Sequence, residues 1–175
     1  MHPAELEEKL ETLTVVVDTR EQDTPKLRMR LEQIGLPYAR EKLNYGDYSA
    51  KLQLNPHINS DETYLDTEFV IERKMSLDEL AQCFTRDRAR FKREFERAED
   101  ACAKTYLVVE NGSWDKILAG QYRSKMTPKA FIASLTTWLA RYDCQIIFCS
   151  SENSGRLIGE IIRREAKEYL EGFVE

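Results

Sequence analysis

The chain has 175 residues, of which 42% are hydrophobic and 33% are charged. This length suits one domain with a buried core, and this balance is that of a globular protein, not a disordered one. The net charge of −5 excludes a dedicated nucleic-acid coat protein, although positive charge can still be local. No apolar run approaches the roughly 18 residues of a membrane span. Residues 1–14 lack the apolar segment of a signal peptide, so we expect a cytoplasmic protein without membrane contact.

The histidines and cysteines argue against two further kinds of site. Only His2 and His57 are present, so a zinc site of histidine and cysteine and a Ser-His-Asp triad are both improbable. The cysteines form no C-x-x-C pair and fall in periodic segments. We therefore expect all four to be buried, reduced thiols: Cys83, Cys102, Cys144 and Cys149.

The first half of the chain is rich in predicted strands. Residues 1–12 are expected to form a short charged helical arm, ahead of a single domain over residues 13–172. Asp23 or Thr24 can cap a helix that has Pro25 at its first position and stops at Gly35. Alternation and apolar runs predict strands at 13–18, 37–41, 47–52 and 67–74, with a loop or hairpin tip at 55–64.

The second half alternates helices with strands. Ser76 and Glu79 have the spacing of a capping box, which predicts a helix start. Early strands followed by alternating helices and strands indicate an α/β fold with a mixed central sheet and helices on both faces. The remaining helices are expected over 86–103, after Ser113, from Thr127 and over 157–170, and the remaining strands at 105–110 and 144–149.

Charged residues end two of the predicted strands. Side chains alternate along a strand, so Glu72 and Lys74 are expected on one face and Arg73 on the other. If the strand that Asp47 opens lies beside this one, Asp47 and Glu72 can share a divalent cation. Mg²⁺ suits one or two carboxylates plus water and substrate phosphate, and it produces a nucleophilic water at neutral pH. Lys74 would orient that water or stabilise charge on the phosphate. The alternative is an ordinary surface ion pair.

The same segments resemble a known family. GD at 46–47 followed by ERKMSLD at 72–78 resembles the GDxₙERKxxxD signature of the XPF-type structure-specific endonucleases, in the PD-(D/E)xK superfamily. VDTRE at 17–21 and YLVVENG at 106–112 are similar to two further core strands of that family. The resemblance covers roughly residues 14–165 and implies a restriction-endonuclease-like fold, DNA as partner and Mg²⁺, or Mn²⁺, as cofactor.

The resemblance also implies roles for individual residues. Asp47 and Glu72 would be metal ligands and Lys74 catalytic, with Arg73 as a supporting member of the catalytic signature. Asp78 would act structurally, either in the first turn of a helix or as a partner of Arg73. Asp18 and Glu21 match acidic positions near the metal and could extend the cluster, hold a second ion or bind its waters.

Basic residues suggest where DNA would lie. Arg86, Arg90, Arg93 and Arg97 step by three or four residues along one side of the predicted helix, opposite an apolar stripe that includes Cys102. This arginine stripe is either a phosphate track or a solvated face paired with Glu94, Glu96 and Asp100. Arg88 lies nearer the apolar side, which suggests that it points toward the metal site. A weaker basic patch, otherwise a simple connector, consists of Tyr122, Arg123, Lys125 and Lys129.

Together with the resemblance, these patterns favour a metal-dependent DNA endonuclease, for which branched or nicked structures are candidate substrates. The alternatives are a catalytically weak DNA-binding module with a nuclease fold, or a subunit that needs a partner chain; homodimerisation is also open. The printed sequence contains neither the tandem helix-hairpin-helix module nor the helicase domain of many relatives, and 84–88 reads FTRDR where many carry a Gly-Arg pair. A stand-alone nuclease is therefore expected.

Overall fold

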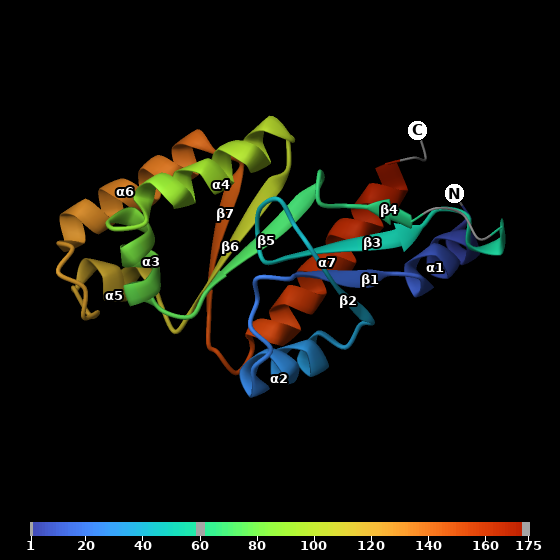
Figure 1. The fold of residues 1–175 in the computed structure, drawn as a ribbon, viewed down its shortest axis with the longest axis horizontal. Helices are drawn as coiled ribbons and strands as arrows, with labels where there is room; N and C mark the ends of the chain where they lie inside the picture. Colours follow the sequence, from blue (N-terminus) through green and yellow to red (C-terminus); the bar gives the residue numbers. More distant parts are fainter. Residues whose placement is uncertain (1, 59–61, 173–175) are drawn as a thin grey trace.

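The computed structural model describes residues 2–58 and 62–172. Within these ranges a mixed sheet of seven strands carries α-helices on both faces, which confirms the predicted α/β architecture (Figure 1). The strand order is β2-β1-β3-β5-β6-β7, and β4 pairs with β3. The strands are β1 Thr14–Asp18, β2 Tyr38–Glu41, β3 Tyr48–Gln53, β4 Glu62–Tyr64, β5 Phe69–Lys74, β6 Lys104–Glu110 and β7 Cys144–Cys149.

The strand β5 lies at the centre of the sheet. It is antiparallel to β3 and parallel to β6, which in turn is parallel to β7. On the other side of β3, β1 runs antiparallel to it and parallel to β2. Since β5 has neighbours on both sides, its backbone is fixed, and its side chains must alternate between the two faces.

Three helices cover one face of the sheet and four cover the other (Figure 1). The first layer holds α1 Pro3–Glu11, α2 Pro25–Ile34 and α7 Ser154–Glu171. The second holds α3 Leu77–Phe84, α4 Arg88–Asp100, α5 Trp114–Leu118 and α6 Pro128–Arg141. The predicted starts are confirmed at Thr24, Ser76 and Thr127, whose side chains each accept a backbone N–H of the first turn.

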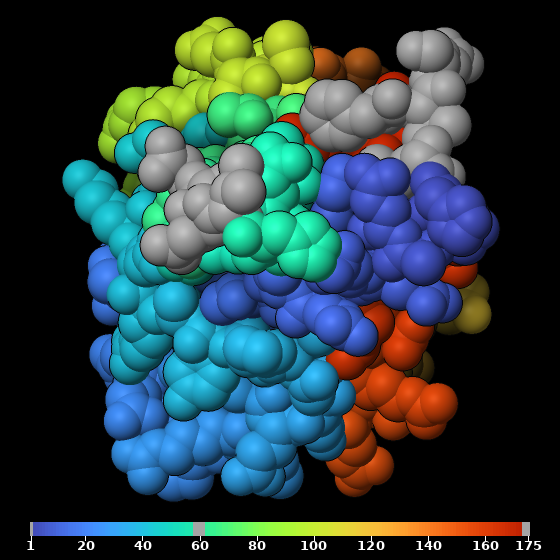
Figure 2. Space-filling view, turned by 90° about the vertical axis from the view of Figure 1, so that its right-hand side faces the viewer, coloured from blue at the N-terminus to red at the C-terminus, as the bar shows by residue number. Residues whose placement is uncertain are grey.

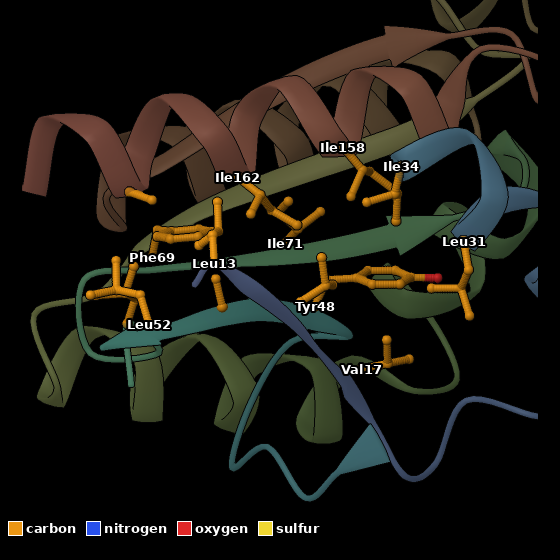
Figure 3. Packing of buried hydrophobic residues seen from close by; sticks show 14 of the residues in the cluster. Leu13, Val17, Leu31, Ile34, Tyr48, Leu52, Phe69, Ile71, Ile158 and Ile162 are labelled. Atoms are coloured by element: carbon orange, nitrogen blue, oxygen red, sulfur yellow. The ribbon is translucent and has the colours of Figure 1, made fainter. Parts of the chain in front are cut away.

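Each layer has its own apolar core. Under α7, Ile162 points toward Ile71 of β5 and Ile158 lies beside Ile34 of α2 (Figure 3). Under α3, α4 and α6, the rings of Phe84, Phe91 and Phe95 surround Trp138. Apolar surface buried in these two cores stabilises the fold by about 25 cal/mol per Å². The sheet is held between them.

The N-terminal helix packs onto the last one. Leu6 and Leu10 of α1 lie against the core beneath α7. Figure 2 shows α1, in dark blue, at the surface beside the orange-red of α7. The predicted arm is therefore helical over Pro3–Glu11 and docked; Met1 lies outside the described residues. No helix within the described ranges combines the length and the hydropathy needed to cross a bilayer.

Three local predictions are wrong. The helix expected over 86–103 begins only at Arg88 and ends at Asp100, because a turn at Thr85 separates it from α3. Cys102 follows that end with φ 58° and is exposed, so the helical periodicity no longer applies to it. Cys144 and Cys149, also expected to be buried, are only half-buried, because β7 is an edge strand of the sheet. The loop or hairpin tip expected at 55–64 agrees with the structure, since β4 pairs antiparallel with β3 and a 3-10 helix at Pro56–Ile58 lies between them; residues 59–61 lie outside the described part.

Candidate active site

Asp47 is held between β1 and β5 by three hydrogen bonds. Its N–H donates to the carbonyl of Ile71 (2.8 Å), its carbonyl accepts the N–H of Asp18 (2.9 Å), and its Oδ2 accepts the N–H of Arg73 (2.8 Å). The turn before it depends on Gly46, which has φ 73° and lies so close to β5 that a Cβ would stand 2.8 Å from Val70 Cβ. The backbone therefore places this carboxylate with little freedom.

Glu72 and Lys74 share the face of β5 that lies under α3 and α4. The pairing of Tyr48 with Ile71 and the bond from the Asp47 N–H to the Ile71 carbonyl place Asp47 beside the end of β5, where the charge of Glu72 acts on it. Lys74 Nζ is 2.5 Å from Glu72 Oε1 and 5.3 Å from the centroid of the Phe91 ring. Glu72 is only 5% exposed and Lys74 8%. The structure thus brings together the three residues that the signature singled out.

The electrostatics of these groups are strongly coupled. Burial and the neighbouring Glu72 carboxylate raise the pKa of Asp47 well above its ordinary value, and Lys74 opposes this shift. Burial alone would lower the pKa of Lys74, but the nearby carboxylates of Glu72 and Asp47 raise it. Lys74 is therefore an ammonium ion at neutral pH. The Lys74 ammonium faces the carboxyl groups of Glu72 and Asp47, so a second cation bound there would meet favourable charge.

The structure adds two residues that the sequence reasoning missed. Glu94 of α4 lies close enough for burial and the charge of Glu72 to raise its pKa. Arg20 bridges Glu94 Oε1 (Nη1, 3.5 Å) and Asp18 Oδ1 (Nε, 2.7 Å). A signal for Glu94 was available: it stands three residues after Phe91 and four before Ala98, on the buried side of the helix.

The two acids after β1 differ in their surroundings. Asp18 is 0% exposed, and its oxygens accept the N–H groups of Arg20 (2.8 Å) and Leu43 (2.7 Å) besides the Arg20 side chain. These bonds occupy both acceptor sites of Oδ1 and one of Oδ2, which leaves one site on Oδ2 for a further partner. Glu21 is partly exposed, accepts from the hydroxyl of Tyr48 (3.3 Å) and raises the pKa of Asp47, so it lies at the rim of the site.

Arg73 points to the opposite face, as the alternation predicts. Its Nη1 lies 3.1 Å from Glu110 Oε2, and Glu110 Oε1 is 3.6 Å from Nη2 of Arg30. All three groups are largely enclosed, and within residues 2–58 and 62–172 both Nε atoms and Glu110 Oε1 lack a hydrogen-bond partner. Arg73 thus contributes its backbone N–H to Asp47 and its side chain to a buried ion network behind the face that carries Glu72 and Lys74.

Asp78 is bonded to the turn before α6 and not to Arg73. It lies in the first turn of α3, as predicted, but its Oδ1 accepts the N–H groups of Arg123 (2.7 Å) and Ser124 (2.8 Å). The alternative prediction of a partnership with Arg73 is therefore wrong. Physically, two backbone donors in the turn between α5 and α6 satisfy this carboxylate.

The arginines of the predicted stripe take different positions. Arg86 precedes α4, whereas Arg90 and Arg93 are exposed on it, and Arg97 donates to the carbonyl of Asn44 (2.9 Å). The prediction that Arg88 points toward the metal site is wrong. Its guanidinium lies 5.2 Å from the Trp138 ring and contacts Ser134 of α6 (3.3 Å), because the packing of α4 on α6 covers that side. The positions of these arginines do not decide whether they contact DNA.

The carboxylates of Asp47 and Glu72 suit a hard divalent cation that also binds phosphate oxygens of the substrate. Among the described residues, no three His, Cys, Asp or Glu side chains converge as a complete metal site. Asp47 and Glu72 nevertheless form a pair of carboxylates, and burial together with the charge of Glu72 raises the pKa of Asp47. Mg²⁺ commonly takes one or two carboxylates and completes its shell with water and phosphate oxygens. These two residues meet that requirement.

Comparisons with known proteins find the same fold in solved structures. XPF from Aeropyrum pernix matches with a TM-score of 0.59 and 20% identity over 86% of this chain and 65% of that one. XPF from Aeropyrum pernix in complex with DNA matches with a TM-score of 0.59 and 21% identity over 89% of this chain and 65% of that one. The chain thus spans 65% of the length of these structures, and no curated protein matches it. The family model of the ERCC4 domain matches residues 17–160, most of the chain, and the chain therefore belongs to the ERCC4 domain family.

Proposed function

We propose that this chain is a divalent-metal-dependent endonuclease that hydrolyses phosphodiester bonds in DNA. The observation that carries the proposal is the enclosed ion pair of Lys74 and Glu72 at the end of the central strand β5, where Asp47 lies beside it. Burying such charges is expensive and adds little stability, so a purely structural role does not account for them. The solved XPF in complex with DNA, which shares this fold, supports DNA as the substrate.

In this proposal Asp47 and Glu72 hold Mg²⁺, for which Mn²⁺ is the substitute to test. When bound there, the ion supplies a water of lowered pKa and neutralises charge on the phosphate. The Lys74 ammonium carries three N–H donors, one of which faces Glu72. The others can donate to the attacking water or to a phosphate oxygen, where negative charge develops. The three backbone hydrogen bonds of Asp47 keep its carboxylate in place.

Cleavage of labelled single strands, duplexes, flaps, forks and nicked circles with Mg²⁺, Mn²⁺ or EDTA tests the proposal. We expect metal-dependent cutting that Glu72→Gln and Lys74→Met each reduce at least about 100-fold. A matched control is the exposed pair of Lys167 and Glu171 on α7 (3.6 Å), in which Lys167→Met and Glu171→Gln should leave cutting unchanged.

Two results would contradict this function. Cutting that persists in both site variants would place the chemistry elsewhere. A wild-type protein that binds DNA but cuts none of these substrates would favour a binding module or a subunit that needs a partner chain. Measuring the mass of the protein in solution, with and without DNA, decides between a monomer and a homodimer.

A further inference from the structure

The helical layer that covers the catalytic face carries exposed cations without an ion-pair partner among the described residues, as does the opposite layer with Lys26 and Arg156. The chain as a whole is acidic, with a net charge of −5. Yet Arg93, Lys125 and Lys129 are exposed, and each lacks an ion-pair partner in the part of the chain that the structure describes. All three lie on α4, on α6 or in the turn before α6. Local positive charge on an acidic protein indicates a surface for an anionic partner.

A groove of about 400 Å³ runs along the outer side of α3 in this layer. Arg86 stands at one end, with its side chain 76% exposed, and Arg123 stands across the groove, with its side chain 94% exposed. The two basic segments that are far apart in the sequence therefore face each other. The lining residues are all polar or charged: Asp78, Gln82, Thr85, Arg86, Arg123 and Ser124.

Asp78 fixes the far wall of this groove. Its Oδ1 accepts the backbone N–H groups of Arg123 and Ser124, and its Oδ2 lies 3.4 Å from Arg123 Nε. These bonds outweigh burial and lower the pKa of Asp78. The carboxylate is thus largely occupied by the turn that it anchors, and the guanidinium of Arg123 remains open to solvent.

We propose that this groove binds backbone phosphates of DNA, and that Asp78 is the positioning residue for its Arg123 wall. Arg, Ser, Thr and Gln side chains are the usual donors to phosphate oxygens, whereas a nucleobase or an apolar peptide would need an apolar surface. The groove lies across α3 from the catalytic centre, since Cys83 on the inner side of α3 lies near Lys74. A helix is about 10–12 Å wide and DNA rises about 3.4 Å per nucleotide, so about three to four nucleotides separate the two sites.

The identity of the ligand rests on the proposed endonuclease function, but the test does not require cutting. Binding of a fluorescent DNA duplex in EDTA is measured by anisotropy over a series of NaCl concentrations. Loss of two phosphate contacts in Arg86→Ala/Arg123→Ala should weaken binding at least about fivefold and reduce the salt slope by about two. The matched control is Arg164→Ala, which removes an exposed charge from α7 on the opposite layer.

Asp78→Ala tests the positioning role. This variant retains both arginines but releases the turn, so its affinity for DNA should fall toward that of Arg123→Ala. Asp78→Asn can still accept both N–H groups, so it should restore most of the affinity. Thermal unfolding checks that each variant is folded. The groove proposal is overturned if the double variant binds like Arg164→Ala, or if the wild type binds no DNA in EDTA. A wild type that binds through the groove but never cuts would support the groove and refute the endonuclease.

Discussion

Replacing Gly46 by alanine should disturb the catalytic carboxylate through the backbone. Gly46 has φ 73°, and an added Cβ would stand 2.8 Å from Val70 Cβ and 3.3 Å from the Ile71 carbonyl oxygen. Left-handed backbone costs an alanine roughly 1–2 kcal/mol. Overpacking against a central strand typically adds 1–3 kcal/mol, and a stiffer unfolded chain offsets about 0.4–1 kcal/mol. The net loss of unfolding free energy should be about 2–4 kcal/mol.

A second glycine separates the two contributions. Gly120 has φ 66°, but the nearest atom to an added Cβ is Pro128 Cγ at 3.4 Å, an ordinary contact. Gly120→Ala should therefore lose only the backbone contribution, about 1 kcal/mol. The difference between the two variants then measures the clash with Val70. Val70→Gly removes the Cβ that causes the clash, so Gly46→Ala/Val70→Gly should recover part of that difference as a coupling free energy.

The assay is thermal unfolding, followed by DNA cleavage well below the midpoint. A protein of this size loses about 2–4 °C of Tm per kcal/mol, so Gly46→Ala should melt about 4–16 °C lower. Cleavage should fall at least about tenfold because Asp47 is displaced. If Gly46→Ala melts no lower than Gly120→Ala, the close approach of Gly46 to Val70 is not a constraint and the reasoning fails.

Three further predictions concern charged groups. Glu110→Ala should lower the unfolding free energy by about 3–5 kcal/mol in urea titrations, because it leaves Arg30 and Arg73 enclosed without a counterion; a loss below 1 kcal/mol would refute this. Asp78 has a lowered pKa, so its stabilisation is present above the ordinary pKa near 4 and is lost as the pH falls through the lowered value. The Tm gap between wild type and Asp78→Ala should therefore shrink below about pH 4, and a gap independent of pH would contradict the assignment. Glu94→Gln should raise the Mg²⁺ concentration for half-maximal cutting severalfold, with little change in the rate at saturating Mg²⁺; an unchanged requirement would exclude Glu94 from the metal environment.

The sequence could predict the part of the site that depends on strand geometry. Alternation along one strand separated Glu72 and Lys74 from Arg73, and the structure confirms both faces. Asp47 required one further assumption, that its strand neighbours β5, and the pairing of β3 with β5 confirms it. The two-faced helical covering followed from the order of strands and helices, and the family comparison agrees.

Contacts between distant segments could not be predicted in the same way. Helical periodicity placed Arg88 on the inner side of α4, but the position of Trp138 on α6 decides where its guanidinium lies. The network of Arg30, Arg73 and Glu110 joins three elements, and no local pattern links them. The bond from Gln82 to Asp87 (2.6 Å) helps close the turn that splits the expected helix.

The central strand also limits how the lengths of related chains can vary. Because β5 serves both layers with alternate residues, one residue inserted after Ile71 would rotate everything beyond it to the other face. The carboxylate and ammonium would then enter the apolar layer beneath α7, and a guanidinium would stand beside Asp47. Turns outside the sheet are free of this alternation. Homologous chains should therefore gain or lose residues in such turns and keep an invariant residue count through β5.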